Sequence, residues 1–210
     1  MAHVRTHSPG SFCWLELYAN DQNAAKQFYQ SLFGWASDDM PMGPGEVYTL
    51  FSLEGRNAAA ATGLNERMRA QGVPPHWMLY ISVESADAAA AKAQQAGGKL
   101  MAPPFDVADF GRMAVVQDPT GAHFSIWQPK GHPGTGITGA PGTLCWADLM
   151  TPDPTAAAKF YVAVMGWKLE PKPDHFSGYL PPTTMEKVGR VAMVDDPQGA
   201  GFALFEPPAH

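Results

Sequence analysis

Two stretches of this chain, 132 positions apart, share one residue pattern. They are FCWLELYANDQNAAKQFYQSLFGW at 12–35 and LCWADLMTPDPTAAAKFYVAVMGW at 144–167. Each copy opens with a short apolar run and continues with apolar residues at helical spacing, such as Ala25, Tyr29 and Leu32 in the first. This pattern predicts a strand followed by a helix in each copy. Asp153-Pro154 supports the second helix, because an N-cap residue followed by proline is a typical helix start.

A second repeat has a different offset of 78 positions. GRMAVVQDPTGAHFSIWQP at 111–129 matches GRVAMVDDPQGAGFALFEP at 189–207. In both copies Asp-Pro-x-Gly separates two apolar runs, and this motif suits a tight turn. Each copy is therefore predicted to be a β-hairpin.

The two offsets differ by 54 residues, so the second half of the chain is shorter than the first by that amount. What it lacks is the counterpart of HWMLYISVESADAAAAKAQQAGGKL at 76–100. That stretch itself predicts a strand and an alanine-rich helix, capped by Ser85 and ended by glycines.

The repeats define a domain organisation. The first unit spans 8–128 and contains two modules, 12–64 and 76–128. A Gly/Pro-rich linker follows at 129–142, and the shortened second unit spans 143–208.

The shortfall has two explanations. Either another chain, such as the second subunit of a homodimer, completes the second unit, or the printed sequence lacks residues that the protein contains. We favour missing residues, because the segment before Gly189 shows no turn signal, and we then expect a backbone break between Tyr179 and Val188.

Charge and composition exclude several partners. The net charge is -6 with no run of Lys or Arg, so we expect no nucleic-acid binding. No apolar stretch approaches the ~20 residues that cross a bilayer, and the N-terminus has no apolar signal core, so we expect a cytoplasmic protein without a membrane partner. The two cysteines, Cys13 and Cys145, form no Cys-x-x-Cys motif, which disfavours a disulfide framework or a thiolate zinc site. Alternation places both toward the helices, as small buried hydrophobic residues.

These motifs resemble the glyoxalase, bleomycin-resistance and ring-cleaving dioxygenase superfamily, also called vicinal oxygen chelate proteins. The likeness extends over nearly the whole chain and is strongest to bacterial tandem glyoxalase-like proteins with four βαβββ modules in about 260 residues. It implies an α+β fold in which repeated βαβββ modules form curled mixed sheets with outer helices. It also implies a cup that, in catalytic members, holds a divalent metal chelating two substrate oxygens.

The resemblance can be tested at the metal-ligand positions that it implies. These positions are occupied here by Trp14, Met78 and Ser125 in the first unit and by Trp146 and Ala203 in the second. None of these side chains suits a hard or borderline cation. We therefore predict no metal at the usual positions and no cofactor.

Alternation along the strands predicts which residues face the cup. The set is Trp14, Glu16, His76, Met78, Tyr80, His123, Ser125 and Trp127, with Trp146 and Asp148 in the equivalent cup of the second unit. Aromatic walls with a few polar groups are typical of small-molecule pockets. The alternative is that these side chains simply fill the sheet interior.

Two functions of different classes follow. The first is metal-free binding of a small hydrophobic or aromatic molecule as the ligand. The second is a metal-dependent lyase, isomerase or dioxygenase with a displaced divalent-cation site at His76, His123 and Glu16, in which Glu16 is the candidate catalytic base. The ligand positions favour binding.

Overall fold

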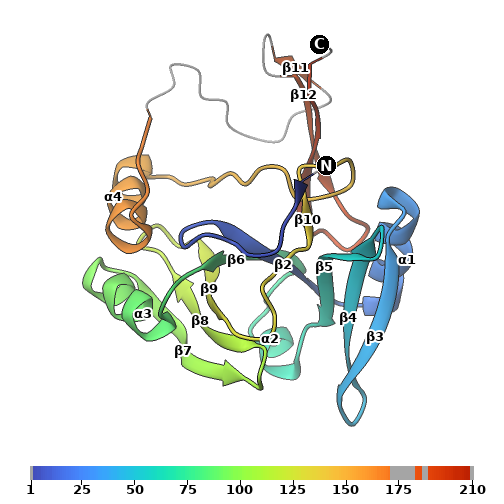
Figure 1. Ribbon diagram of the computed structural model, residues 1–210, viewed down its shortest axis with the longest axis horizontal. Helices are drawn as coiled ribbons and strands as arrows, with labels where there is room; N and C mark the ends of the chain where they lie inside the picture. The colour runs from blue at the N-terminus through green and yellow to red at the C-terminus, as the bar shows by residue number, and fades with distance from the viewer. Residues whose placement is uncertain (1, 171–182, 186–188, 209–210) are drawn as a thin grey trace. The chain divides into compact units, whose positions relative to one another are not determined.

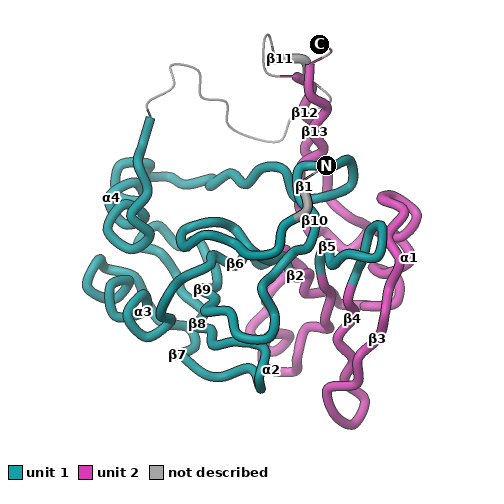
Figure 2. Tube along the Cα trace, viewed as in Figure 1, with its two compact units in different colours: residues 1–15, 51–59, 78–171 teal, residues 16–50, 60–77, 172–210 magenta. Residues whose placement is uncertain are grey.

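The computed structural model describes residues 2–170, 183–185 and 189–208. The expected break between Tyr179 and Val188 lies largely outside the described residues, so it stays a prediction. The described chain forms two compact units, coloured in Figure 2. Unit 1 comprises 1–15, 51–59 and 78–171, and unit 2 comprises 16–50, 60–77 and 172–210. These units are not the two halves of the sequence, because each contains segments from both.

The first module contains a strand, a helix and three further strands. They are β2 (Phe12–Ala19), α1 (Gln22–Phe33), β3 (Ala36–Gly43), β4 (Glu46–Leu53) and β5 (Arg56–Gly63). The strand order is β3-β4-β5-β2, and β5 runs parallel to β2. The short helix α2 (Glu66–Ala70) follows.

The second module repeats this pattern. It contains β6 (His76–Ser82), α3 (Ala86–Gln95), β7 (Lys99–Val107), β8 (Gly111–Gln117) and β9 (His123–Pro129). The order β6-β9-β8-β7 joins β6 and β9 in parallel and the remaining neighbours antiparallel. The fold is thus α+β with mixed sheets built from βαβββ modules, as predicted (Figure 1).

The rest of the chain is less regular. A two-stranded pair joins β1 (Ala2–His3) to β10 (Ile137–Thr138), and α4 (Pro154–Met165) follows. A three-stranded sheet has the order β11 (Thr183–Met185), β12 (Gly189–Asp195) and β13 (Gly201–Glu206). The predicted hairpins at 111–129 and 189–207 are both confirmed.

The helix ends follow local chemistry. At the start of α1, the Asp21 side chain accepts a hydrogen bond from the backbone N–H of Ala24. At the start of α4, the Asp153 side chain accepts one from the backbone N–H of Ala156. Gly34 and Gly166 end the same helices in the left-handed conformation, with φ of 70° and 71°. The repeated sequence therefore builds the same helix twice.

One strand prediction is wrong. Residues 144–151 match β2 in sequence but form no strand, and Cys145 is exposed rather than buried, whereas Cys13 is buried as expected. A strand needs neighbours for its backbone hydrogen bonds. The neighbours of β2 in its sheet are β5 and β6, and the second half lacks the counterpart of 76–100, the stretch that contains β6.

In each unit a helix from one half of the sequence packs on the hairpin from the other half. In unit 1, the Tyr161 hydroxyl on α4 donates to Asp118 Oδ2 in the β8–β9 turn, at 3.2 Å. In unit 2, the Tyr29 hydroxyl on α1 donates to Asp196 Oδ2 in the β12–β13 turn, at 3.1 Å. The two helix–hairpin contacts are thus duplicates of each other with the halves exchanged.

The core of unit 1 lies between its helices and one face of its strands. Figure 1 shows α3 and α4 beside each other, and both contribute to one buried cluster. The cluster consists of Ile81, Val83, Ala86, Ala89, Ala90, Ala93, Ala114, Val116, Phe124, Ile126, Ala157, Phe160, Tyr161 and Val164. This packing fixes which strand residues face away from the helices.

Candidate functional site

The predicted alternation of faces is confirmed within each unit. In unit 1, Phe124 and Ile126 lie in the helix-side core, so Ser125 and Trp127 lie on the opposite face. In unit 2, Trp77 contacts Tyr29 of α1, whereas its neighbour His76 stacks on Tyr18 with ring centroids 5.1 Å apart.

The cup-facing residues of unit 1 are mostly buried. The exposed fractions are 3% for Trp14, 6% for Met78, 5% for Tyr80, 0% for Ser125 and 5% for Trp127, whereas His123 at the start of β9 is exposed. Tyr80 and Trp127 meet edge to face, with ring centroids 6.3 Å apart. The Trp127 indole lies over Gly111, where any Cβ would overlap the ring. Unit 1 therefore contains a buried aromatic group on the side of the strands away from the helices.

The linker after β9 covers this aromatic group. The His132 ring meets Trp14 at right angles, 4.5 Å between centroids, and the Trp127 indole N–H donates to the His132 carbonyl at 2.9 Å. Three residues further on, the backbone N–H of Thr135 donates to the Cys13 carbonyl at 2.8 Å. The linker is thus fastened at both ends of the stretch that lies on Trp14 and Trp127.

The environment favours the neutral form of His132. Burial lowers the pKa of its imidazole, and the electrostatic influence of the nearby His7 lowers it further. His7 is itself held by a contact between its Nε2 and the Thr135 carbonyl, at 3.0 Å. The lowered pKa favours the uncharged form of the imidazole over Trp14, and this form suits its apolar surroundings.

Ser125 stands out among the cup residues. Its hydroxyl is fully buried and has no hydrogen-bond partner among the described atoms. In the sheet it lies between Tyr80 on β6 and Val115 on β8. Leaving a buried hydroxyl without a partner costs about 1–3 kcal/mol. Such an atom is a donor and an acceptor available to a molecule that reaches it.

Two further predicted site residues, Glu16 and His76, lie in unit 2. Glu16 is 5% exposed. His76 Nδ1 lies 2.8 Å from the Pro74 carbonyl, and because a carbonyl only accepts, Nδ1 carries the proton in this contact. The displaced metal site would combine Glu16 and His76 of unit 2 with His123 of unit 1, and it stays a prediction.

The metal-ligand positions of unit 1 do not fit a divalent cation. An indole has no lone pair to donate, a thioether prefers soft ions, and a lone serine hydroxyl is a weak neutral ligand. Among the described residues, no group of three His, Cys, Asp or Glu side chains is placed to hold a metal ion.

The predicted second cup is not formed in the described residues. Trp146 is 68% exposed, and its indole N–H donates to the Asp148 carboxylate at 2.7 Å on the irregular segment 144–151. With no strand here, alternation does not direct these two side chains into a cup.

Two shallow surface hollows of about 390 Å³ each lie elsewhere. One, in unit 1, is lined by Pro154, Thr155, Ala158, Lys159, Val162 and Leu169 along α4. The other, in unit 2, is lined by Asn20, Asp21, Gln22, Asn23, Asp39, Gly45, Val47 and Thr49. Neither contains a cup residue. We therefore take the buried group around Ser125, and neither hollow, as the candidate site.

The βαβββ modules and the buried aromatic face define a glyoxalase-type fold, and comparison identifies the family. Residues 11–126 match the Glyoxalase/Bleomycin resistance protein/Dioxygenase superfamily. The protein CFP32 of Mycobacterium tuberculosis, whose name marks it as a candidate glyoxylase, is 34% identical over 245 aligned positions, covering 92% of this chain and 94% of CFP32. This chain therefore belongs to that superfamily. Because 245 aligned positions exceed its 210 residues, CFP32 has residues where this chain has none.

Further relatives and solved structures agree. The anthracycline biosynthesis protein DnrV of Streptomyces peucetius is 34% identical over 169 residues, covering 76% of this chain and 62% of DnrV. The 2,3-dioxygenase LapB of Pseudomonas sp. KL28 has a TM-score of 0.58 at 12% identity, covering 94% of this chain and 93% of LapB. A Mn(II)-bound glyoxalase from Novosphingobium aromaticivorans has a TM-score of 0.52 at 16% identity, covering 76% of this chain and 54% of its own. At these identities the structures show the fold alone.

No helix among the described residues has the length and apolar character needed to cross a membrane.

Sequence reasoning missed His132, which lies in a segment identified only as a Gly/Pro linker. A linker without periodicity gives no signal for the face on which it packs. Gly111 did carry a signal, because a glycine at the start of a strand often marks a close approach of another group.

Proposed function

We propose that this protein binds a small hydrophobic or aromatic molecule on the cup face of unit 1, without a metal ion. The observation that carries the proposal is the buried hydroxyl of Ser125, which has no partner among the described atoms and lies in an aromatic group. Apolar walls with one placed polar group match the usual composition of a small-molecule site.

The ligand would replace the linker. Trp14 and Trp127 are covered by His132, so a planar ligand stacking on them takes the place of the imidazole ring. The polar end of the ligand would then reach Ser125. The name of DnrV, an anthracycline biosynthesis protein, supports a polycyclic aromatic ligand with ring oxygens.

Binding can be tested with 1,8-dihydroxyanthraquinone as the probe and tryptophan fluorescence as the signal. We expect saturable quenching that weakens by about two- to tenfold in Trp127→Phe, since an aromatic stacking contact contributes about 0.5–1.5 kcal/mol beyond its buried area. Trp77→Phe is the matched control, because Trp77 lies on the helix side in unit 2 and contacts Tyr29. Quenching without saturation, or equal weakening in both variants, would reject the site.

Ser125→Ala separates the hydroxyl from the walls. We expect unchanged or slightly raised stability, because the variant removes an unsatisfied buried group, together with weaker probe binding. Elemental analysis of protein purified without chelator tests the metal. Stoichiometric Zn, Ni, Mn or Fe that is lost in His76→Ala or His123→Ala would replace this proposal with the metal-dependent enzyme.

A further inference from the structure

Among the described residues, the hairpin in unit 2 has no helix in the position that α3 occupies on its copy in unit 1. In unit 1, α3 packs on four residues of β8 and β9 that are at most 4% exposed: Ala114, Val116, Phe124 and Ile126. The repeat places Ala192, Val194, Phe202 and Leu204 at the same positions in unit 2. None of these four is buried, and Leu204 is 37% exposed. In unit 2, Phe202 of this face contacts Tyr29 and Phe33 of α1. The same apolar face is thus built twice, but among the described residues only the copy in unit 1 is also covered by a helix in the position of α3.

The edge of this hairpin differs in the same way. In unit 1, β9 pairs in parallel with β6, which places Tyr80 opposite Ser125. At the equivalent edge of β13, no strand among the described residues pairs. Phe205 corresponds to Trp127 in the repeat. Its exposed fraction is 42%, against 5% for Trp127.

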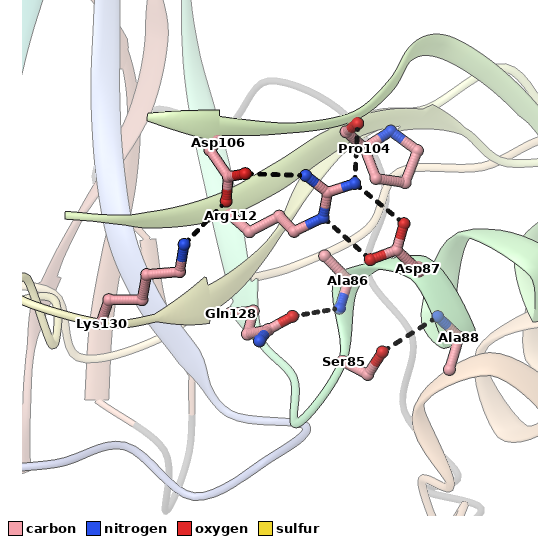
Figure 3. A network of polar contacts seen from close by, with 9 residues as sticks. All are labelled: Ser85, Ala86, Asp87, Ala88, Pro104, Asp106, Arg112, Gln128 and Lys130. Carbon is pink, nitrogen blue, oxygen red and sulfur yellow. Dashed lines mark hydrogen bonds and ion pairs between the residues drawn. The ribbon is translucent and has the colours of Figure 1, made fainter. Parts of the chain in front are cut away.

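Two polar contacts fasten α3 to the unit 1 hairpin (Figure 3). The Arg112 guanidinium donates to both carboxylate oxygens of Asp87 in the first helical turn, at 2.8 and 3.0 Å, and thereby lowers the pKa of that carboxyl. The Gln128 side chain accepts from the backbone N–H of Ala86 at 3.0 Å. Together they recognise the start of a helix that has an acidic residue in its first turn.

The unit 2 hairpin keeps both polar positions. The repeat places Arg190 where Arg112 stands and Glu206 where Gln128 stands. Their side chains are 55% and 68% exposed and form a loose pair at 3.4 Å. A carboxylate at the second position suits helix N–H groups at least as well as an amide does.

The helix α1, which packs on the unit 2 hairpin, also leaves apolar side chains exposed that are buried in its copy α4. In unit 1, α4 presents Phe160 and Val164 to the shared core, and they are 1% and 6% exposed. Their counterparts on α1 are Phe28, which is partly exposed, and Leu32, which is 41% exposed. The uncovered surface therefore continues from β12 and β13 onto α1.

We propose that β12, β13 and this face of α1 form a docking surface for a strand–helix segment supplied by a second polypeptide. The strand adds in parallel to the edge of β13. The helix presents small residues to the hairpin, sets its N-terminus on Glu206 and pairs a first-turn carboxylate with Arg190. The occupant is specified by its covered copy in unit 1, where β6 and α3 fill the same position. The proposal takes up the other explanation of the short second half, in which a second chain completes it, and it is independent of small-molecule binding.

The probe is a fluorescently labelled peptide with the sequence of residues 76–100, added to the full chain and followed by fluorescence anisotropy. The unit 1 position does not compete, because its own β6 and α3 are present at high effective concentration within the chain. We expect saturable binding that weakens at least about fivefold in Arg190→Glu and is lost in Leu204→Asp. A peptide carrying Asp87→Arg should bind the Arg190→Glu chain more tightly than it binds the original chain.

Arg67→Glu, an exposed charge reversal on α2 of the same unit, is the control and should leave binding unchanged. Absence of saturable binding overturns the proposal, as does equal weakening by Arg190→Glu and Arg67→Glu. Sedimentation of the chain alone should show a monomer. A dimer that dissociates in Leu204→Asp would assign the surface to a second copy of this chain and overturn the proposed occupant.

Discussion

Phenylalanine substitution of Tyr29 and Tyr161 should destabilise the protein by unequal amounts, although the two residues are copies of each other. The Tyr161 hydroxyl makes one bond, to Asp118 Oδ2, and the Asp118 carboxyl group is 3% exposed. Losing a hydrogen bond to a buried carboxylate costs about 1.5–3 kcal/mol. We therefore expect Tyr161→Phe to lower the free energy of unfolding by that amount.

Tyr29 has a second bond to lose. Its hydroxyl donates to Asp196 at 3.1 Å and accepts from the Trp77 indole N–H, also at 3.1 Å. Trp77 is half-buried, so losing its acceptor adds about 0.5–1.5 kcal/mol. Tyr29→Phe should cost about 1 kcal/mol more than Tyr161→Phe.

The measurement is guanidinium denaturation followed by circular dichroism, with native-state amide exchange to assign each loss to its hairpin. Protection should fall in β9 for Tyr161→Phe and in β13 for Tyr29→Phe. A Tyr161→Phe variant within 0.5 kcal/mol of the original protein, a conventional threshold for a surface change, would show that the hydroxyl–carboxylate contact is not stabilising. A larger cost for Tyr161→Phe than for Tyr29→Phe would refute the counting of bonds.

Three further predictions follow. Burial raises the pKa of the Cys13 thiol to about 12, so a thiol reagent at pH 8 should modify exposed Cys145 quickly and Cys13 only after unfolding. Because the pKa of His132 is lowered in the folded state, the unfolded state takes up the proton first on acidification. Stability should fall as pH drops below about 6.5, and His132→Gln should flatten that slope by up to about 1.4 kcal/mol per pH unit in denaturation series. Gly134→Ala should cost about 2–4 kcal/mol in thermal melts, because φ is +117° and the added Cβ would overlap the Cys13 carbonyl oxygen. The control Gly139→Ala, which has open space around it, should cost about 1 kcal/mol. Equal costs would contradict the close approach of Gly134 to Cys13.

Local signals made the helices and turns predictable. Asp153-Pro154 marks the start of α4, and Asp-Pro-x-Gly marks both hairpin turns, because these residues act on their own backbone within a few positions. The segment 144–151 was predicted as a strand because its composition copies β2. A strand depends on partners that are distant in sequence, and no local pattern reveals whether they are present.

The candidate site was predictable in part for the same reason. Period-two alternation placed Ser125 and Trp127 on the face opposite Phe124 and Ile126, which lie in the helix-side core. Trp14, predicted on the same face, shares with Trp127 a contact to the His132 ring. That His132 would cover them was not predictable, because its segment has no periodicity. Whether the face binds a ligand depends on how easily this cover leaves, a property that no residue pattern encodes.

The exchange of helices between the halves also bears on how the chain folds as it is made. Tyr29 and its partner Asp196 are 167 residues apart in sequence. At a synthesis rate of about 5–20 residues per second, roughly ten to thirty seconds pass between the emergence of α1 and that of the hairpin it packs on. During that interval the apolar face of α1 lacks its final partner, and the ribosome-bound chain is a natural client for chaperones that shield exposed hydrophobic helices. The helix α4, by contrast, emerges after its hairpin β8–β9 and can dock at once.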